Sequence, residues 1–459
     1  MDALESPGAP LRIAISGAGI AGLTAAISLR KLPGVVVDLY EQAAAFREIG
    51  ASIGLGPNGL RTLETLGVHN ALREGVCIRQ KGRHHQVYRH WRTGHVLACD
   101  AHRAVTESQH ATARFHRAHL HAALLVHVPL DTIHLGKKTA RIDVSGEDGL
   151  VLHFADGTSA HADLLIGADG IHSATRKWFV PHHKLHWTGW VAMRSTFDAS
   201  LLDGVDFPDD AAHWVAPHRS FFHGRLGHGQ FTTVGGFTVD PADPPETYRN
   251  VRWDDPGSLQ RLRDLYRGWH PTVQALLEKT PYTRLYPNMA GEPLDTWVYG
   301  GGCVALIGDA AHTHGGAFAA GGSLAIDDAF CLLLALQHVW PATAGAKPCP
   351  TQIQHALRLF EATRLPHVAK VMTLARHQII GKLAPGQKSE GSEGSKGSED
   401  ARRDGRAADD DEKLMAFIRS RPDTAWINEH SVEAAFREVV EAEAAASRVD
   451  RDRLPHSQL

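Results

Sequence analysis

A glycine-rich turn near the start of the chain constrains the fold more than any other feature. The stretch LRIAISGAGIAGLTAAISLRKL indicates a short buried strand, Leu11–Ser16, followed by a tight turn and a helix. Gly17, Gly19 and Gly22 form the pattern G-x-G-x-x-G, which permits the turn, lets the backbone approach a pyrophosphate and allows the helix to pack on the strand. Phosphates bound there meet the unpaired N–H groups of the helix N-terminus. The pattern predicts a Rossmann-like domain.

A carboxylate follows at the distance that dinucleotide binding requires. The second strand, VVVDLYE, ends at Glu41, nineteen residues after Gly22. A carboxylate there accepts hydrogen bonds from ribose hydroxyls and repels a 2′-phosphate. A tight turn without a ligand would not need this acid. Together the elements predict dinucleotide binding and leave open whether the ligand is NAD or FAD.

Two later strands also end in small and acidic residues. ADLLIGADGIHSATR contains the buried run Leu164–Ile166 followed by Asp169 and Gly170, and CVALIGDAAHTHGG leads to Gly308 and Asp309. Ligands of open α/β sheets bind outside the carboxyl ends of the strands. Three such ends predict one extended ligand that runs across them.

The segment after Asp309 is almost free of bulky side chains. Residues 310–322 are mostly Gly, Ala, His and Thr, and a helix is expected from about Ser323 to Val339, with Ser323 as its N-cap. A flexible glycine loop would explain the glycines but not the buried strand and the cap on either side. We therefore expect a ligand to approach the backbone here.

Composition excludes several classes of protein. The 459 residues are 43% hydrophobic, enough for two or three domains, and the net charge of −3 gives no reason to expect nucleic acid as a partner. No apolar run approaches about 18 residues, so we expect no membrane span. The N-terminus lacks a signal-peptide pattern, and the five cysteines form no C-x-x-C pair. These features predict a soluble cytoplasmic protein.

The 31 histidines invite a metal-binding interpretation. His116, His119 and His121 lie close together in FHRAHLHAAL, but the chain has no H-E-x-x-H motif, and Arg117 within the cluster would repel a cation. We predict no metal site.

Taken together, the three motifs resemble those of the single-component (group A) FAD-dependent aromatic hydroxylases, in particular the salicylate hydroxylase-like enzymes of fungal type and the phenol-dearomatising monooxygenases. The resemblance covers roughly residues 10–380 and includes EQAAAFREIGASIGLGPNGLRTLETLG and FHRAHLHAAL. It implies an α/β fold with a discontinuous Rossmann-like FAD-binding domain, a mixed-sheet substrate domain and a C-terminal helical segment. The expected limits are 10–75, 106–180 and 284–345 for the FAD-binding domain, 76–105 and 181–283 for the substrate domain, and 346–383 and 413–446 for the C-terminal helices. Residues 384–412 are charged and rich in Gly and Ser, which predicts a disordered linker.

The same resemblance implies which residues contact FAD. The pyrophosphate would lie on Gly17, Gly19, Gly22 and Arg117, the adenosine ribose on Glu41, and the ribityl chain on Asp309. Asp169, Gly170 and Arg176 belong to the motif associated with both FAD and the nicotinamide cofactor, Arg47 to the loop that passes the flavin, and Gly321 and Gly322 to the bare run against the isoalloxazine ring. Gly316 stands where the family usually has a proline, which changes the surroundings of the flavin's reactive edge.

Residues 182–282 are expected to form the sheet that holds the substrate. Arg194 falls where the dearomatising enzymes carry an arginine that binds the phenolate, and its alternative is an exposed strand arginine. His223 aligns with a histidine of the family and is the candidate general base, with a surface strand histidine as the alternative. Ser220 and Gly224 replace polar or aromatic residues of relatives, and His218 could take the place of His223 after a one-residue register change. Further pocket candidates are Tyr282, Arg284 and Tyr286.

The resemblance implies a monooxygenase that uses NADH or NADPH as a transient reductant and O2 to hydroxylate a small aromatic substrate through a C4a-hydroperoxyflavin. Alternatives on the same scaffold are dearomatising hydroxylation, epoxidation or Baeyer–Villiger oxidation, and a non-enzymatic binding module. A disulfide oxidoreductase is disfavoured because no cysteine pair lies near the flavin motifs. A homodimer is compatible with this class of protein.

Overall fold

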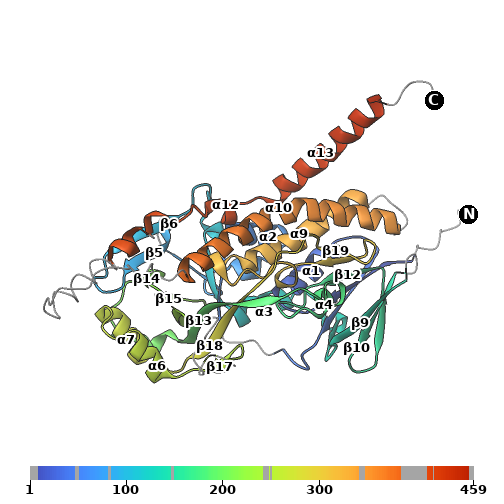
Figure 1. Ribbon diagram of the computed structural model, residues 1–459. Helices are drawn as coiled ribbons and strands as arrows, with labels where there is room; N and C mark the ends of the chain where they lie inside the picture. Colours follow the sequence, from blue (N-terminus) through green and yellow to red (C-terminus); the bar gives the residue numbers. More distant parts are fainter. Residues whose placement is uncertain are drawn as a thin grey trace, which may run out of the picture.

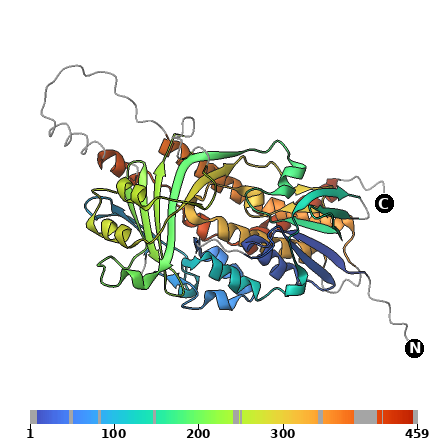
Figure 2. The ribbon, with the colours of Figure 1, turned by 90° about the horizontal axis from the view of Figure 1, so that it is seen from below.

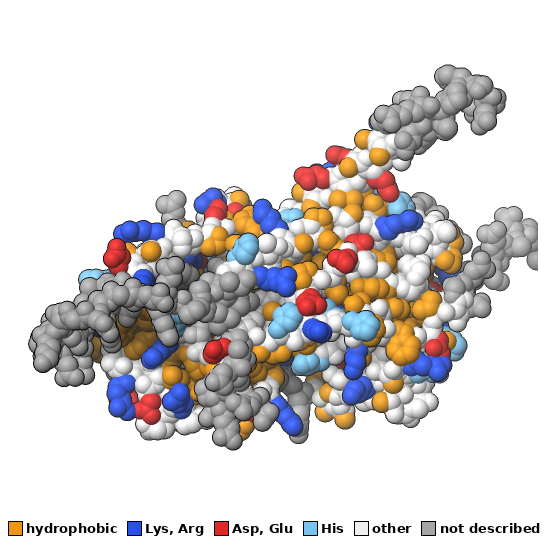
Figure 3. Space-filling view, viewed as in Figure 1, with side chains coloured by type: hydrophobic (Ala, Val, Ile, Leu, Met, Phe, Trp, Pro, Cys, Tyr) orange, Lys and Arg blue, Asp and Glu red, His pale blue; other side chains and the backbone are white. Residues whose placement is uncertain are grey.

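The computed structural model describes residues 9–46, 51–80, 84–145, 149–240, 248, 251–340, 347–383, 411–416 and 418–453 (Figure 1). The green and yellow strands of an eight-stranded sheet lie at one end of the molecule, and the N-terminal strands, in dark blue, lie at the other (Figure 2). On the face shown in Figure 3, basic and acidic side chains are interspersed.

A six-stranded sheet carries the N-terminal motif. Its order is β19-β20-β12-β1-β2-β8, and all neighbouring strands are parallel except β19, which is antiparallel to β20. The strands are β1 (Leu11–Ser16), β2 (Val35–Glu41), β8 (Ile133–Leu135), β12 (Leu164–Gly167), β19 (Val298–Tyr299) and β20 (Val304–Leu306). The near-continuous apolar runs of β1 and β12 arise because both faces of the sheet are covered.

Alternate residues of these strands enter different cores. Ile13 and Ile15 of β1 pack with the helices, whereas Ala14 packs with an antiparallel sheet of β9 (Thr139–Val144), β10 (Leu150–Phe154) and β11 (Ser159–Ala162). The helical layer contains α1 (Ile20–Leu29), α2 (Pro57–Thr65), α3 (Arg117–Leu125), α9 (Gly321–Val339) and α10 (Pro350–Leu383). Two short helices, α4 (Ala174–Phe179) and α8 (Asp309–His312), follow β12 and β20.

Helix α9 is a core helix. It is long and apolar enough to cross a membrane, but 72% of its most apolar window is buried inside the molecule. It begins at Gly321, with Ala320 at the N-cap, so the predicted Ser323 cap is wrong. The Ser323 hydroxyl instead accepts a hydrogen bond of 2.9 Å from the backbone N–H of Gly56, which precedes α2.

The eight-stranded sheet has the order β17-β18-β13-β16-β15-β14-β5-β6. Its strands are β5 (His84–His90), β6 (Val96–Ala101), β13 (Leu185–Asp198), β14 (Ala212–Ala216), β15 (Arg219–Arg225), β16 (Gln230–Thr238), β17 (Asp255–Pro256) and β18 (Arg284–Gly291). One face packs on α6 (Leu259–Leu265) and α7 (Pro271–Lys279) in a second core. The other face meets a small sheet of β3 (Ser52–Leu55), β4 (Ile78–Arg79) and β7 (Ala113–His116), where Thr232 donates to Ser52 Oγ at 3.3 Å.

The sequence analysis placed Arg284–Gly291 with the FAD-binding domain, whereas this segment is β18 and pairs with β13. The motif-based limit cuts through a sheet because no motif marks where this strand begins. The other domain limits stay predictions.

The C-terminal part contains α12 (Ala425–Asn428) and α13 (Val432–Arg453), and α13 projects from the body of the molecule (Figure 1). Of the predicted linker, residues 384–410 lie outside the described residues. Asp411 and Glu412 are in a helical segment, so the prediction of disorder is wrong for them.

Candidate active site

The glycine turn after β1 is built by close backbone packing. Gly17 has φ 101°, and a Cβ there would lie 2.5 Å from the carbonyl oxygen of Ala168; a Cβ on Gly22 would lie 1.9 Å from the carbonyl oxygen of Gly17. A Cβ on Gly19 would meet nothing within 4 Å. Gly17 and Gly22 are therefore required by packing, while Gly19 faces open space at the N-terminus of α1, where an anion is favoured.

Glu41 is held beside this turn. Its Oε2 accepts from the backbone N–H of Ala18 and its Oε1 from that of Ala43, both at 2.9 Å. Each carboxylate oxygen keeps a second lone pair. The position fits a carboxylate that accepts ribose hydroxyls.

Asp169 shapes its own loop. Its carboxylate accepts from the hydroxyl of Ser173 and from the N–H and hydroxyl of Thr175, the last two at 2.9 and 3.0 Å. Gly170 has φ 75°, and nothing would lie within 4 Å of a Cβ there. The structure thus shows Asp169 fixing the turn into α4, and its direct contact with a cofactor stays a prediction.

Arg176 joins this loop to α8. The side chain is buried and donates from Nη1 to the carbonyl oxygens of Asp309 at 3.0 Å and Ala310 at 2.9 Å, and from Nη2 to that of Ile171. Burial lowers the pKa of the guanidinium. Arg176 therefore connects the two motifs that follow β12 and β20.

Asp309 is exposed, although Gly308 and Ala310 on either side of it are buried. Among the described residues no hydrogen bond reaches its carboxylate oxygens. An acid at the end of a buried strand, with no hydrogen bond to its carboxylate from the described residues, is available to a ligand.

The bare run after α8 is attached to β18. The N–H of Gly291 donates to the carbonyl oxygen of Thr313, and Asn288 Nδ2 to that of Gly315, both at 2.9 Å. Phe318 and Ala319 have φ of 59° and 51°, which is rare for residues other than glycine and is typical of functional segments.

The two predicted glycines at the start of α9 differ in their surroundings. A Cβ on Gly322 would lie 2.9 Å from Ile53 Cδ1, so packing on β3 excludes a side chain there. A Cβ on Gly321 would lie 3.3 Å from His314 Cε1 and 4.0 Å from Asp309 Oδ1. Only Gly321 faces the polar groups of the site.

The sequence analysis missed a buried charge network behind the site. The Asp328 carboxylate binds both His312 and Arg364. The neighbouring Asp327 accepts from Asn58 Nδ2 at 2.7 Å and from the Thr62 hydroxyl at 2.9 Å. The dipeptide Asp327–Asp328 within an apolar helix was the available signal, because buried acids require partners.

The pKa values of these two acids move in opposite directions. Burial raises the pKa of Asp327 to about 6. Burial would also raise that of Asp328, but His312 and Arg364 lower it to about 2. Asp328 therefore keeps its charge to a much lower pH than Asp327 does.

Arg194 lies on the face of the eight-stranded sheet that is turned toward the bare run. It alternates along β13 with Met193 and Ser195, which face α6 and α7, and its guanidinium lies 5.4 Å from the ring centroid of Tyr286 on β18. The side chain is half-buried, burial lowers its pKa, and it has no ion pair with a described residue. An arginine in this state is suited to bind an anionic ligand.

His223 lies on the opposite face. It is completely buried among Phe207, Trp214 and Phe231, and neither ring nitrogen has a hydrogen-bond partner among the described residues. Burial lowers its pKa to about 3. This placement gives no support to the predicted role of general base, because the imidazole faces the core under α6 and α7.

The remaining candidates are placed as follows. Arg117 is the first residue of α3, and its backbone N–H donates to the carbonyl oxygen of Ala51 at 2.8 Å. Arg47 lies outside the described residues. Tyr286 donates its hydroxyl to Asp254 Oδ1 at 2.6 Å and packs beside Arg194, whereas Tyr282 donates to the carbonyl oxygen of Thr196 at 2.6 Å.

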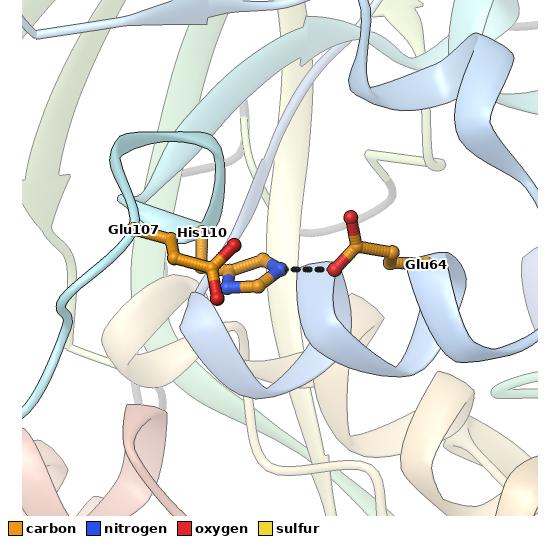
Figure 4. Close-up of side chains that lie close together, drawn as sticks. All are labelled: Glu64, Glu107 and His110. Atoms are coloured by element: carbon orange, nitrogen blue, oxygen red, sulfur yellow. Dashed lines mark hydrogen bonds and ion pairs between the residues drawn. The ribbon is translucent and has the colours of Figure 1, made fainter.

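One group of the described side chains has metal-ligating atoms within 4.8 Å of one another: Glu64, Glu107 and His110 (Figure 4). His110 Nε2 lies 2.7 Å from Glu64 Oε2, and Gln109 Nε2 donates to both carboxylates. The polar atoms of these side chains thus have hydrogen-bond partners within the group, and we assign no metal to them.

Comparison with known proteins connects this geometry to a family. Residues 11–373 match the family model described as FAD binding domain. The chain belongs to this family. A 6-hydroxynicotinate 3-monooxygenase of Pseudomonas fluorescens is 32% identical to this flavoprotein over 373 residues, which are 79% of this chain and 90% of the relative. A salicylate hydroxylase of Pseudomonas putida is 31% identical over 381 residues, 79% of this chain and 83% of the relative.

Solved structures agree on the fold of the flavoprotein. A salicylate hydroxylase substrate complex has a TM-score of 0.73 at 23% identity and covers 94% of this chain and 98% of its own. HpxO of Klebsiella pneumoniae, complexed with FAD and uric acid, has a TM-score of 0.70 at 24% identity, with coverages of 96% and 99%. These likenesses show the fold alone.

The flavoprotein is an FAD-dependent monooxygenase of the aromatic hydroxylase family, and NAD(P)H is the reductant typical of the family. The predictions of fold class, family and cofactor are confirmed. The open face at Gly19, the fixed Glu41 and the exposed Asp309 fit FAD as the bound dinucleotide. The fungal type and the individual site residues stay predictions.

Proposed function

We propose that this enzyme hydroxylates a phenolic substrate whose oxygen is bound as the phenolate by Arg194. The observation that carries the proposal is the state of this arginine: half-buried, on the face turned toward the bare run, and without an ion pair among the described residues. Partial burial of an unpaired cation costs solvation free energy, so an anionic ligand is the partner that fits.

Under this proposal one set of residues binds FAD, and Arg194 binds and orients the phenol. The turn built by Gly17, Gly19 and Gly22 would hold the FAD pyrophosphate at its open face beside Gly19. Glu41 would hold the ribose and Asp309 the ribityl chain. Bound FAD, reduced by NAD(P)H, supplies the activation of O2. Arg194 lowers the pKa of the phenol and so raises the share of the electron-rich phenolate. The sheet face and the bare run exclude water from the substrate.

The test is O2-dependent oxidation of NADH and NADPH by the purified enzyme with a panel of phenols that includes salicylate and 6-hydroxynicotinate, with mass spectrometry of the products. The matched control for each phenol is its methyl ether, which cannot ionise. We expect one or more phenols to stimulate oxidation and to gain one oxygen atom, and their ethers to be inactive.

Other outcomes separate the alternatives. Equal turnover of phenol and ether would overturn the phenolate proposal and favour the epoxidising or Baeyer–Villiger class. A product that gains oxygen and loses the aromatic absorbance would identify the dearomatising subtype. Loss of the carboxyl group from salicylate would identify the decarboxylating subtype.

We also propose a cytoplasmic location, no membrane partner and a homodimer. Fractionation of cells that produce the full chain tests the first two proposals. Light scattering coupled to size-exclusion chromatography tests the third.

A further inference from the structure

A second histidine of the site, His314, has a ring nitrogen without a hydrogen-bond partner among the described residues. It lies in the bare run between α8 and α9, its side chain is 5% exposed, and its Nε2 has no hydrogen bond with any described residue. Its backbone is fixed, because His314 forms a β-bridge with Ala290 of β18. Buried polar atoms in native proteins almost always have a partner, so the missing one is expected to be a ligand.

The imidazole points to the start of α9. The point at which a Cβ would stand on Gly321 lies 3.3 Å from His314 Cε1 and 3.8 Å from its Nε2, and 4.0 Å from Asp309 Oδ1. Helix α9 has 19 residues and no side-chain cap on its first N–H groups. Three groups therefore surround one point: the imidazole of His314, the exposed carboxylate of Asp309 and the positive N-terminal end of α9.

The charge state of His314 depends on its neighbours. Burial lowers its pKa to about 4; Asp309 acts against this shift, and His312 adds to it. Both of these groups belong to α8, while α9 contributes its N-terminal N–H groups and β18 contributes Ala290. The ring is thus uncharged at neutral pH, and an added negative charge beside it would favour protonation.

We propose that Nε2–H of His314 donates a hydrogen bond to the edge of the FAD ring system at the start of α9, and that His314 binds a proton when the flavin is reduced. The inference rests on FAD binding, not on the identity of the substrate. Hydride transfer from NAD(P)H would bring two electrons and one proton to bound FAD and would add one negative charge beside His314. A further proton, taken from solvent, binds at Nδ1 of His314, so that an imidazolium and the helix N-terminus both face that charge.

The test measures the FAD dissociation constant and the two-electron midpoint potential of the holoenzyme between pH 5.5 and 8.5, without substrate. Each proton taken up with two electrons contributes a slope of about 30 mV per pH unit. We expect the wild-type slope to be about twice this value over part of the range. Hydroxylation of phenols plays no part in these measurements, so the proposed function can fail without affecting them.

Two substitutions separate hydrogen bonding from protonation. His314→Gln places an amide N–H near the position of Nε2 but cannot titrate, so we expect FAD affinity within about threefold of wild type and the one-proton slope throughout. His314→Phe removes the donor, and we expect FAD affinity to fall about five- to tenfold. His367→Gln is the control, because Nε2 of His367 is also buried and has no hydrogen bond to a described residue, but it lies in α10 beside His430. The slope of this variant should match that of wild type.

Three results would overturn the inference: a one-proton slope in the wild type across the range, a two-proton slope retained by His314→Gln, or unchanged FAD affinity in His314→Phe. If the phenylalanine variant does not fold, the glutamine variant still decides the protonation step.

Discussion

Nε2 of His312 lies 2.7 Å from Oδ2 of Asp328, and both side chains are completely buried. Arg364 Nε donates to the other carboxylate oxygen at 2.9 Å. One carboxylate on α9 therefore binds a side chain from α8 and one from α10. The stretch 308–312 is held against the core by this carboxylate, while Asp309 within it is exposed on the side where the ligand is expected.

We predict that Asp328→Asn lowers the free energy of unfolding of the apoprotein by about 3–5 kcal/mol, because it removes the carboxylate that is hydrogen-bonded to the buried Arg364 cation. Urea unfolding followed by circular dichroism measures the change. Asp423→Asn is the control, since its ion pair with Arg103 joins side chains that are 50% and 71% exposed and should contribute no more than about 1 kcal/mol. Similar losses in the two variants would contradict the network.

We predict that Asp309→Ala weakens FAD binding by about 10- to 150-fold, the effect of losing a hydrogen bond to a charged group. Apoprotein stability should not change, because Asp309 is exposed and no described residue bonds to its carboxylate. Fluorescence titration with FAD and thermal melting of the apoprotein measure the two quantities. Asp131→Ala, at another exposed acid, is the control for FAD affinity. A melting temperature lowered as far as in Asp328→Asn would show a structural role instead.

The sequence predicted the elements whose signal is local. β1, the glycine turn and β2 are fixed by apolar runs, by backbone close approach and by one acid at a set distance, all within thirty-one residues of each other. The start of α9 was predicted two residues late, because Ser323 is a good N-cap in isolation but bonds to the backbone of Gly56, far away in the sequence.

A segment of small residues can be required by close packing of helices and strands or by a ligand that approaches the backbone. The sequence alone cannot separate these two causes. A Cβ on Gly308 would lie 3.1 Å from that of Ala21 and 3.2 Å from that of Ala325, so helix packing requires this glycine. Gly322 is required by Ile53, and only Gly321 faces the polar groups of the site. The charge network of His312, Asp328 and Arg364 could not be predicted from the sequence either, because its members come together only when α8, α9 and α10 pack.

We predict that Arg194→Gln weakens the binding of the phenolic substrate by tenfold or more, because the phenolate loses a charge-assisted hydrogen bond. The fold should tolerate the change, since the side chain has no ion pair with a described residue. Perturbation of the flavin absorbance on titration with substrate gives the dissociation constant. Arg284→Gln is the matched control: Arg284 lies directly opposite Arg194 on β18 but donates to the carbonyl oxygen of Asp254 at 3.0 Å. An equal loss in both variants would show that general positive charge, rather than Arg194, binds the substrate.

We predict that His223→Phe retains turnover and leaves the pH profile of kcat/KM unchanged, because the imidazole faces α6 and α7. The free energy of unfolding, in contrast, should become less dependent on pH. With a pKa of about 3 when folded and about 6.5 when unfolded, His223 binds a proton only in the unfolded chain between these values. The unfolded state is then favoured as the pH falls, so wild type loses stability below about pH 6.5, by up to about 1.4 kcal/mol per pH unit from this residue.

The phenylalanine variant lacks that contribution, so the stability difference between variant and wild type should grow in favour of the variant from pH 7 to pH 5. The substitution also removes from an aromatic core two ring nitrogens that have no hydrogen bond to the part of the chain that the structure describes. This gain offsets the strain of the larger ring at neutral pH. Urea unfolding at several pH values, with kcat/KM measured over the same range, distinguishes the two roles. The opposite result would be that His223→Phe loses the acidic limb of the kcat/KM profile while its stability depends on pH as that of wild type does. That result would support His223 as the general base.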